Sequence, residues 1–294
     1  MKDLRRVMGE FMSYLRFERN SSIETITAYR RDISQLIEFL QNDEIPLRAD
    51  AVSQNVIRGF LNYLDNKYNL EPATVARKIN CFRSFFNFCV DQDYIMMSPM
   101  RKITPPKIPK RMPIYLKKGE LNKLLSAPDQ FKNEEHWLRD KTMLYLFAFT
   151  GIRRSELIGL QWSDIDFKNK TLKVFGKGQK ERFLPLKEDL IEILWDYLQT
   201  RLPLENQYII INGTGNQMDK STLRLIFKKW VERASLNAEL ITPHKLRHTF
   251  ATRLLEEGVD IVTIQELMGH DDTESTLIYA HTNQDRKKEA VDKL

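Results

Sequence analysis

The sequence predicts a mainly α-helical protein with one small antiparallel β-sheet, an α+β fold, divided into two domains. Three observations support this prediction: helical spacing of apolar residues over the first hundred positions, a basic proline-rich segment, and a group of short β-like runs. The predicted domains are a helical domain at residues 1–100 and a mixed domain at residues 113–294, with residues 101–112 as the linker.

The first hundred residues have the pattern of amphipathic helices. The segment "SSIETITAYRRDISQLIEFL" has apolar residues at helical spacing, namely Ile23, Ile26, Tyr29, Ile33, Leu36 and Leu40. Ser21 and Glu24 have the spacing of a capping box, which predicts the start of that helix. "VIRGFLNYLDNKY" and "PATVARKINCFRSFFNFCV" are similar, and Pro72 suits the first turn of the latter. We therefore expect four or five helices here.

The segment "SPMRKITPPKIPKRMP" holds five of the eleven prolines of the chain. Proline stiffens a chain and removes backbone donors, so this segment should be extended. Between Arg101 and Arg111 there are five basic residues and no acidic one. The sequence leaves two interpretations open: a solvated tether, or a strap that lies along a nucleic-acid backbone.

The second domain has a mixed pattern. "DKTMLYLFAFTGI" predicts an apolar helix that ends near Gly151, and "IDFKNKTLKVFGKGQKERFLPL" predicts a small antiparallel meander. "TPHKLRHTFATRLLEEG" predicts a helix with Thr242 as its N-cap and Pro243 in its first turn, ended by Gly258. Its apolar stripe consists of Leu246, Phe250 and Leu254. "DIVTIQELMG" predicts a further short helix from Asp260 to Gly269.

The charge of the chain favours an anionic partner. The net charge is +6, and residues 1–112 hold 18 Lys and Arg against 13 Asp and Glu. The N-terminus has no apolar signal-peptide core, and no apolar run approaches the length of a membrane span. Cys81 and Cys89 lie too far apart along one predicted helix to form a disulfide. We therefore expect a reduced, cytoplasmic protein, and no membrane partner.

Four of the five histidines lie in the last 51 residues. His244, Arg247 and His248 share the positive end of one predicted helix, where an anion binds favourably. A metal site there is disfavoured, because Arg247 repels a cation and the Glu of an H-E-x-x-H helix is absent. Two interpretations remain at this point: polar surface and capping residues, or a site for phosphoryl transfer.

Phosphoryl transfer needs fixed positive charge, a nucleophile and a proton donor for the leaving oxygen. Arginine suits the first role, and "TGIRRSEL" offers Arg153 and Arg154, with Glu156 close enough to hold one of them. Lys177 in "GKGQK" offers an ammonium as proton donor, or it is only a turn residue. This turn is not a nucleotide-binding P-loop, because the G-x-x-x-x-G-K-S/T pattern is absent.

The segments "TGIRRSEL", "GKGQKERFLPL", "HKLRHTFATRLLEEG", "LMGH" and "STLIYAH" occur in the order of the tyrosine recombinases, or phage integrases. The chain resembles the Xer-type site-specific recombinases over nearly its whole length. The resemblance implies a SAM-like core-binding domain and a catalytic domain that form a C-shaped clamp around DNA. It also implies strand exchange in a tetramer, of this chain alone or with a paralogue, through a Holliday junction, without metal or other cofactor.

The resemblance also assigns roles to individual residues. Arg153 and Arg247 match the pair that clamps the scissile phosphate, and Lys177 matches the lysine that protonates the leaving 5′-oxygen. His244 and His270 match the histidines that handle protons and stabilise the transition state. Tyr279 matches the nucleophile that forms a 3′-phosphotyrosyl bond. The cations that bind the phosphate would activate this tyrosine by stabilising its phenolate. Two matches are supporting residues: Glu156 and His248.

DNA contacts are expected on two elements. "DKSTLRLIFKKWVERA" resembles the helix that this family places in the major groove, and its exposed candidates are Lys220, Ser221, Arg224 and Lys228. The candidates in the N-terminal domain are Arg77, Lys78 and Arg83. For every candidate on both elements, solvated surface charge is the alternative interpretation. Two positions depart from the family pattern: Arg154 follows the catalytic arginine, and Lys117 replaces a helix-capping Ser or Thr. The short tail after Tyr279 leaves its contact with a neighbouring protomer open.

The resemblance predicts resolution of chromosome or plasmid dimers, with a DNA translocase or architectural proteins as accessory partners. The same motifs fit an integrase or resolvase of a mobile element. Three further alternatives are a type IB topoisomerase, a non-catalytic DNA-binding protein and a metal hydrolase.

Overall fold

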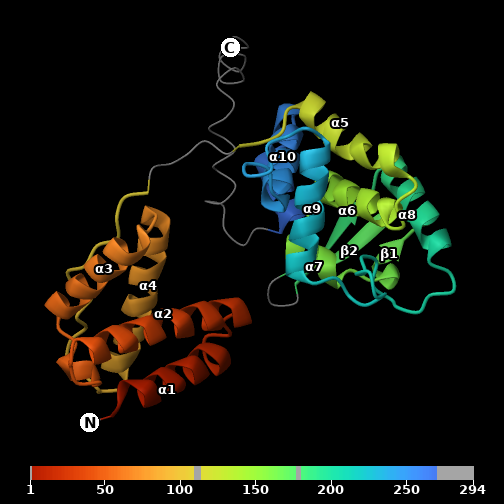
Figure 1. Ribbon diagram of the computed structural model, residues 1–294. Coiled ribbons are helices and arrows are strands. Elements are labelled where there is room, and N and C mark those ends of the chain that lie inside the picture. The colour runs from red at the N-terminus through yellow and green to blue at the C-terminus, as the bar shows by residue number, and fades with distance from the viewer. Residues whose placement is uncertain (1, 109–113, 177–179, 270–294) are drawn as a thin grey trace, which may run out of the picture. The chain divides into compact units, whose positions relative to one another are not determined.

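The computed structural model describes residues 2–108, 114–176 and 180–269 of the 294-residue chain. It divides into two compact units, residues 1–110 and 111–294, each described here by itself (Figure 1). In the described part of the chain, no helix combines the length and the apolar character needed to cross a membrane.

The N-terminal unit is helical. Its described elements are α1 (Leu4–Phe17), α2 (Ile23–Asn42), the 3₁₀ turn η1 (Ala49–Ala51), α3 (Gln54–Tyr68) and α4 (Pro72–Asp91). Four α-helices agree with the lower of the two numbers predicted. Helix α4 packs against both α1 and α2 around a phenylalanine-rich core (Figure 1), whose fully buried rings are Phe11, Phe60, Phe82, Phe85 and Phe86.

Helix α2 begins one residue later than predicted. Ser22, not Ser21, is the N-cap, and its Oγ accepts a hydrogen bond of 3.2 Å from the amide of Thr25. Two adjacent serines present the same side chain, so the sequence pattern alone does not fix which of them caps the helix.

Residues after α4 belong to the core of the N-terminal unit. Met100 and Ile103 are buried in it, and Arg83 Nη2 donates to the carbonyl of Ile103 at 2.9 Å. The first residues of the expected linker thus pack onto α4. Residues 109–112 of that linker lie outside the described residues.

The C-terminal unit is built around α6 (Trp137–Thr150), which is buried over most of its surface. Helix α8 (Glu188–Thr200) and helix α10 (Pro243–Glu256) pack on α6, and α9 (Lys220–Arg233) contacts it as well (Figure 1). The remaining helical elements are α5 (Lys118–Ser126), η2 (Ala127–Phe131), α7 (Arg154–Gly159), η3 (Trp162–Asp164) and α11 (Ile261–Met268). A central helix buried all round explains why its sequence is apolar without strong amphipathicity.

The predicted meander is confirmed. It consists of β1 (Ile165–Asp166), β2 (Thr171–Phe175) and β3 (Glu181–Pro185), in the order β1-β2-β3 with antiparallel pairing throughout. Leu172 pairs with Leu184, and both are buried. This pairing sets the inward face of the sheet, on which Arg182 also lies because side chains alternate along a strand.

Helix starts in this unit follow the predicted residues. Helix α5 begins after Lys117, whose amide donates at 2.8 Å to the Glu120 carboxylate, so the lysine does not prevent that helix start. Helix α11 begins after Asp260, which accepts from the amides of Val262 and Thr263, and it ends at Gly269 with φ +60°. Left-handed backbone at a helix end is the conformation glycine adopts most easily.

Candidate active site

Helix α10 carries His244, Arg247 and His248 at its start. Pro243 occupies the first turn, as predicted, whereas Thr242 has N-cap backbone geometry without a capping hydrogen bond from its side chain. The rings of His244 and His248 lie edge to face, with centroids 4.4 Å apart. The first turn of the helix therefore brings both imidazoles together beside the positive end of the helix dipole.

Arg247 points from α10 into the protein and is buried. Its Nη1 donates to the carbonyl of Gly151 at 2.6 Å, and its Nη2 donates to the carbonyl of Met268 at 2.5 Å. These bonds connect α10 with the end of α6 and with the end of α11. Because the guanidinium is planar, two bonds at its two terminal nitrogens fix its orientation.

Gly151 makes this contact possible. It ends α6 with φ +58°, and a Cβ built on it lies only 2.4 Å from Cδ1 of Phe250. A larger residue is therefore excluded both by the backbone conformation and by the ring of α10. The helix-ending glycine predicted from "TGIRRSEL" thus also allows the close approach of α6 and α10.

Arg153 and Glu156 form the start of α7. Glu156 accepts a hydrogen bond of 2.8 Å from the backbone amide of Arg153 and another of 2.8 Å from its Nη1. Arg153 Nη2 donates to the carbonyl of Gly269 at 2.7 Å. The prediction that Glu156 lies close enough to hold an arginine is confirmed by these contacts, and the arginine held is Arg153, whereas Arg154 is exposed.

Arg182 is a site residue that the sequence motifs did not single out. It reaches from β3 to the Glu156 carboxylate, with Nη1 at 3.0 Å from Oε1 and Nη2 at 2.7 Å from Oε2. One signal was available: Leu184 and Leu186 face the core, so the alternation of a strand places Arg182 on the core side as well. A cation on a core-facing position needs a buried anion.

The three arginines meet at the end of α11. The carbonyls of Leu267, Met268 and Gly269 accept, in that order, from Arg182 Nε at 3.0 Å, from Arg247 at 2.5 Å and from Arg153 at 2.7 Å. The last carbonyls of a helix have no partner within the helix, and they carry the negative end of its dipole. The end of α11 thus orders three guanidinium groups from three distant sequence segments.

The electrostatics of the site follow from this arrangement. Burial raises the pKa of Glu156, but hydrogen bonds from Arg182 and Arg153 outweigh that effect and hold this pKa at about 2. The pKa of His244 lies below its usual 6.5, because the surrounding protein removes water and because Arg247, Lys245 and Arg153 repel its proton. Glu156 is ionised and His244 is neutral at pH 7.

This arrangement suits a bound phosphate. Three guanidinium groups meet at the end of α11, and Arg153 and Arg182 share one carboxylate, that of Glu156. The site therefore has an excess of positive charge, and the partly exposed Arg153 brings some of it to the surface. A neutral imidazole next to that charge can donate or accept a proton. Among the described residues, no three His, Cys, Asp or Glu side chains are grouped so that they could hold a metal ion.

The described residues bring together five of the eight predicted site residues, namely Arg153, Glu156, His244, Arg247 and His248. The other three, Lys177, His270 and Tyr279, lie outside the described residues. Their roles stay predictions.

The predicted DNA-contacting residues of α9 are exposed. Lys220, Ser221, Arg224 and Lys228 recur at about one helical turn, so they lie on one side of the helix. Asp219 caps this helix by accepting from the amides of Ser221 and Thr222. Lys228 pairs with Glu239 at 3.1 Å, which reduces the charge it offers to an external partner.

The predicted DNA-contacting residues of α4 differ in environment. Lys78 is buried, and its ammonium donates at 2.8 Å to Asp32, which is itself fully buried, and also to Gln35. Arg77 also donates to Asp32 but remains partly exposed. Lys78 thus uses its charge inside the domain, where Asp32 requires a counter-charge.

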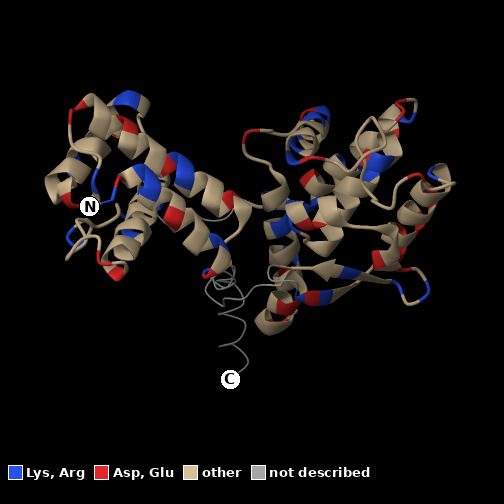
Figure 2. Ribbon diagram, turned by 90° about the horizontal axis from the view of Figure 1, so that it is seen from below, with Lys and Arg blue, Asp and Glu red and all other residues tan. Residues whose placement is uncertain are grey.

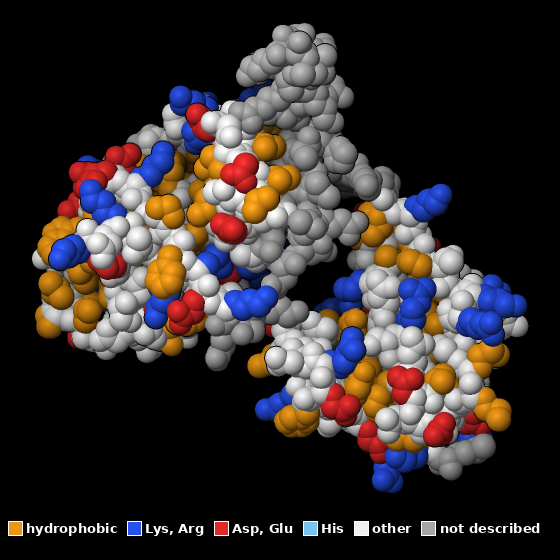
Figure 3. Space-filling model, turned by 180° about the vertical axis from the view of Figure 1, so that it is seen from behind, with side chains coloured by type: hydrophobic (Ala, Val, Ile, Leu, Met, Phe, Trp, Pro, Cys, Tyr) orange, Lys and Arg blue, Asp and Glu red, His pale blue; other side chains and the backbone are white. Residues whose placement is uncertain are grey.

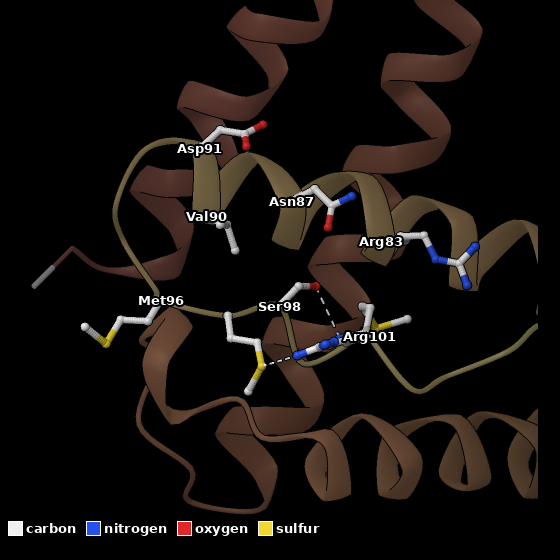
Figure 4. A pocket seen from close by; sticks show the side chains of 9 residues that line it. Arg83, Asn87, Val90, Asp91, Met96, Ser98 and Arg101 are labelled. Carbon is white, nitrogen blue, oxygen red and sulfur yellow. Dashed lines mark hydrogen bonds between the residues drawn. The ribbon is translucent and has the colours of Figure 1, made fainter.

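Arg83 lies at the edge of a pocket between the end of α4 and the segment that follows it (Figure 4). Arg101 lines the same pocket, so two cations lie at this place on the N-terminal unit. Basic and acidic residues are interspersed over the helices of this unit in Figure 2. Figure 3 shows one face of this unit. Asp and Glu side chains lie mainly in the lower half of that face, whereas Lys and Arg side chains lie over all of it.

Comparison with known proteins identifies the family. The profile of the phage integrase family matches residues 115–286, and that of the N-terminal SAM-like domain of phage integrases matches residues 8–93. The chain belongs to the phage integrase family. It is a tyrosine recombinase, an enzyme that cleaves and rejoins DNA strands.

Its relatives include Xer recombinases. The recombinase is 37% identical over 297 residues to the tyrosine recombinase XerC of Oceanobacillus iheyensis, which covers 99% of this chain and 96% of the relative. It is 34% identical over 282 residues to the tyrosine recombinase XerD of Staphylococcus epidermidis, with 94% of each chain covered.

Solved structures agree with the fold of the recombinase. XerH bound to palindromic difH substrate, a post-cleavage complex, is 25% identical with a TM-score of 0.75, and the match covers 93% of this chain and 80% of that chain. XerA recombinase is 28% identical with a TM-score of 0.54, and 98% of each chain is covered. A SAM-like helical domain followed by a catalytic integrase domain is thus the architecture of this chain.

Proposed function

We propose that this recombinase cleaves one specific DNA site through Tyr279 and rejoins it through the same covalent bond. The observation that carries the proposal is the placement of Arg153 and Arg247 on two adjacent carbonyls of α11, beside neutral His244. Two fixed guanidinium forks next to a proton-transferring imidazole form a binding place for a phosphate that gains negative charge.

In the proposed reaction, the Tyr279 hydroxyl gives its proton to one of the two histidines, His244 or His270, and its oxygen attacks the scissile phosphorus. The bond from phosphorus to the 5′-oxygen breaks, and that oxygen takes a proton from Lys177. The 3′-phosphotyrosyl bond retains the energy of the phosphodiester, so a 5′-hydroxyl can attack it and rejoin a strand without a cofactor. Arg153, Arg247, His244 and His270 stabilise the charge of the pentacoordinate phosphate, with His248 and Glu156 as support.

The proposed cellular role is resolution of chromosome or plasmid dimers. Similarity to XerC and XerD over nearly the whole chain supports this role. Both units would then contact duplex DNA. Four protomers, identical or of two kinds, would exchange strands through a Holliday junction, with accessory proteins as possible partners. Integration or excision of a mobile element is the alternative, which the choice of DNA site distinguishes.

Covalent trapping tests the proposal. Purified protein is mixed with sheared DNA from its own source, quenched in SDS, and the protein-linked ends are recovered and sequenced. We expect ends clustered at one site, linked through the 3′-phosphate, that disappear with Tyr279→Phe while DNA binding is retained. A single cluster at a chromosomal site supports dimer resolution, and a cluster at the border of a mobile element supports the alternative.

Other outcomes contradict the proposal. Ends scattered at random indicate a topoisomerase, and the absence of covalent ends with both the protein alone and added paralogue indicates a DNA-binding protein. Arg247→Ala serves as the second variant: loss of a transition-state contact should slow cleavage by about 100-fold or more. Normal cleavage by Arg247→Ala contradicts the clamp role of that arginine.

A further inference from the structure

We propose that Arg182 is a positioning residue for DNA cleavage, which orients Arg153 by holding the Glu156 carboxylate and the end of α11 in one arrangement. This inference rests on the proposed function, because it assigns Arg153 to the scissile phosphate. It adds a residue from β3 to a site otherwise built from the starts of α7 and α10 and the end of α11.

The first step of the argument is the contact with Glu156. Arg182 binds both carboxylate oxygens, Oε1 at 3.0 Å and Oε2 at 2.7 Å, in the forked geometry that fixes both groups in one plane. The side chains of Arg182 and Glu156 are 11% and 5% exposed. Little water competes for these bonds, so the fork holds the carboxylate firmly.

The second step is that Arg153 uses the same two oxygens. Its Nη1 donates to Oε1 and its backbone amide donates to Oε2, both at 2.8 Å. The orientation of the carboxylate therefore determines where the Arg153 guanidinium lies. Without Arg182, Arg153 is the one residue in the described part of the chain that still bonds to the Glu156 carboxylate. The terminal torsion of Glu156 is then restrained by the same group that it is meant to orient.

The third step concerns α11. Arg182 Nε donates to the carbonyl of Leu267 at 3.0 Å, and a Cβ built on Gly269 lies 3.0 Å from Arg182 Nη1. The guanidinium thus packs directly over Gly269, whose carbonyl accepts from Arg153 Nη2. Arg182 therefore restrains both anchors of Arg153, the carboxylate and the carbonyl.

All three nitrogens of Arg182 donate to protein groups. Two of these nitrogens bind the Glu156 carboxylate directly, so we assign Arg182 a positioning role and not a contact with the phosphate. A displacement of about 1 Å in a group that contacts the reacting centre can slow a reaction by about 100-fold. We expect an effect of that size on cleavage and little effect on DNA affinity.

The experiment uses full-length protein and a duplex carrying the site recovered by covalent trapping. Arg182→Met is compared with wild type in single-turnover cleavage and in DNA binding. We expect cleavage slower by about 100-fold with a dissociation constant changed by less than about threefold. Arg182→Lys, which keeps the charge without the fork, should fall between the two.

Arg201→Met is the matched control. Arg201 also holds backbone carbonyls of the same unit, those of Ile209 and Asn206, but it has no contact with Glu156 or α11 among the bonds described. We expect its cleavage rate to stay within about threefold of wild type. If both variants slow cleavage equally, the effect is general loss of stability and the positioning role is wrong.

A double-mutant cycle tests the route through Glu156. Because Arg182 acts on Arg153 through that carboxylate, Arg182→Met should add less than about threefold in a Glu156→Gln background. Effects that multiply as if independent overturn the proposal.

Hydrogen exchange separates this inference from the proposed function. In Arg182→Met, the amide of Arg153 and the amides at the end of α11 should exchange faster than in wild type, and Arg201→Met should leave them unchanged.

If wild type never forms a covalent complex with DNA, the proposed function fails. If wild type cleaves and Arg182→Met cleaves within about threefold of it, or exchange at Arg153 is unchanged, only the positioning role fails. If Arg182→Met does not fold, Arg182→Lys decides by the same readouts.

Discussion

The Arg247 guanidinium donates a hydrogen bond to the carbonyl oxygen of Gly151, 2.6 Å away, and so joins the start of α10 to the end of α6. Gly151 lies two residues before Arg153 in the sequence. The contact therefore brings Arg247, the cation of one sequence motif, close to the segment that carries Arg153, the cation of another. The contact requires glycine at position 151, because the backbone there is left-handed and a Cβ atom would overlap the Phe250 ring. A packing constraint and a functional contact thus meet at one residue.

Gly151→Ala is expected to destabilise the protein. The alanine has φ +58° and a Cβ that overlaps Phe250 at 2.4 Å, so strain and displacement of the ring together should cost about 2–4 kcal/mol. Urea unfolding measures the change. Gly119→Ala in α5 is the control, since a Cβ there has open space, and it should change the free energy of unfolding by less than about 1 kcal/mol. Equal stability of the two variants contradicts the steric argument.

The stability of the protein should depend on Glu156 in acid. Its pKa is about 2 in the folded protein and near 4.5 when unfolded, so its contribution is complete above pH 4.5 and is lost as pH falls from 4.5 to 2. A lowering of this size corresponds to about 3 kcal/mol. Glu156→Gln should therefore be less stable by about that amount at pH 7, and the difference should shrink in the acid window.

Unfolding free energies of both proteins between pH 2 and pH 7 check this prediction. A constant difference across that range is the result that contradicts it.

His244 should be neutral in the free protein and gain a proton when an anion binds. Loss of water and three nearby cations lower its pKa below 6.5, and a bound phosphate offsets those cations and raises it. Because the pKa of His244 is lower in the folded protein than in the unfolded chain, the unfolded chain binds the proton more readily. His244 therefore lowers the free energy of unfolding as pH falls below 6.5. Titration of its ring by NMR, with and without inorganic phosphate at matched ionic strength, measures both values. A pKa above 6.5 without phosphate is the contrary result.

Arg224 and Lys78 should respond differently to substitution. Arg224 is exposed on the side of α9 predicted to contact DNA, so Arg224→Ala should weaken binding and reduce the slope of log affinity against log salt by about 1. Fluorescence anisotropy with a labelled duplex at several salt concentrations measures both. An unchanged slope excludes a phosphate contact by Arg224.

Lys78→Met should instead lower stability. It removes a buried hydrogen bond to the Asp32 carboxylate, at an expected cost of about 2 kcal/mol. Among the residues that the structure describes, Arg77 is then the remaining side-chain donor to that carboxylate. At a temperature where the variant is folded, its DNA affinity and salt slope should match wild type. A reduced slope with unchanged unfolding shows that Lys78 contacts DNA after all.

The sequence predicted the parts of the site whose signals are local. Gly151, Gly269 and Asp260 mark helix ends because the conformation or the side chain needed there belongs to few residue types. The spacing of Arg153 and Glu156 predicted their contact, because three residues are nearly one turn of a helix.

Tertiary structure decided the rest. Arg182 and Lys78 are both cations on elements with exposed positions, and their roles depend on a carboxylate from another segment, Glu156 or Asp32. The meeting of three guanidinium groups at the end of α11 likewise exists only after α7, α10 and β3 have packed around it. The sequence alone determined the type of chemistry and the ends of the helices that carry the site, because both depend on residue types and spacings within short segments. Folding determined which charges face each other, because burial forces distant opposite charges to pair.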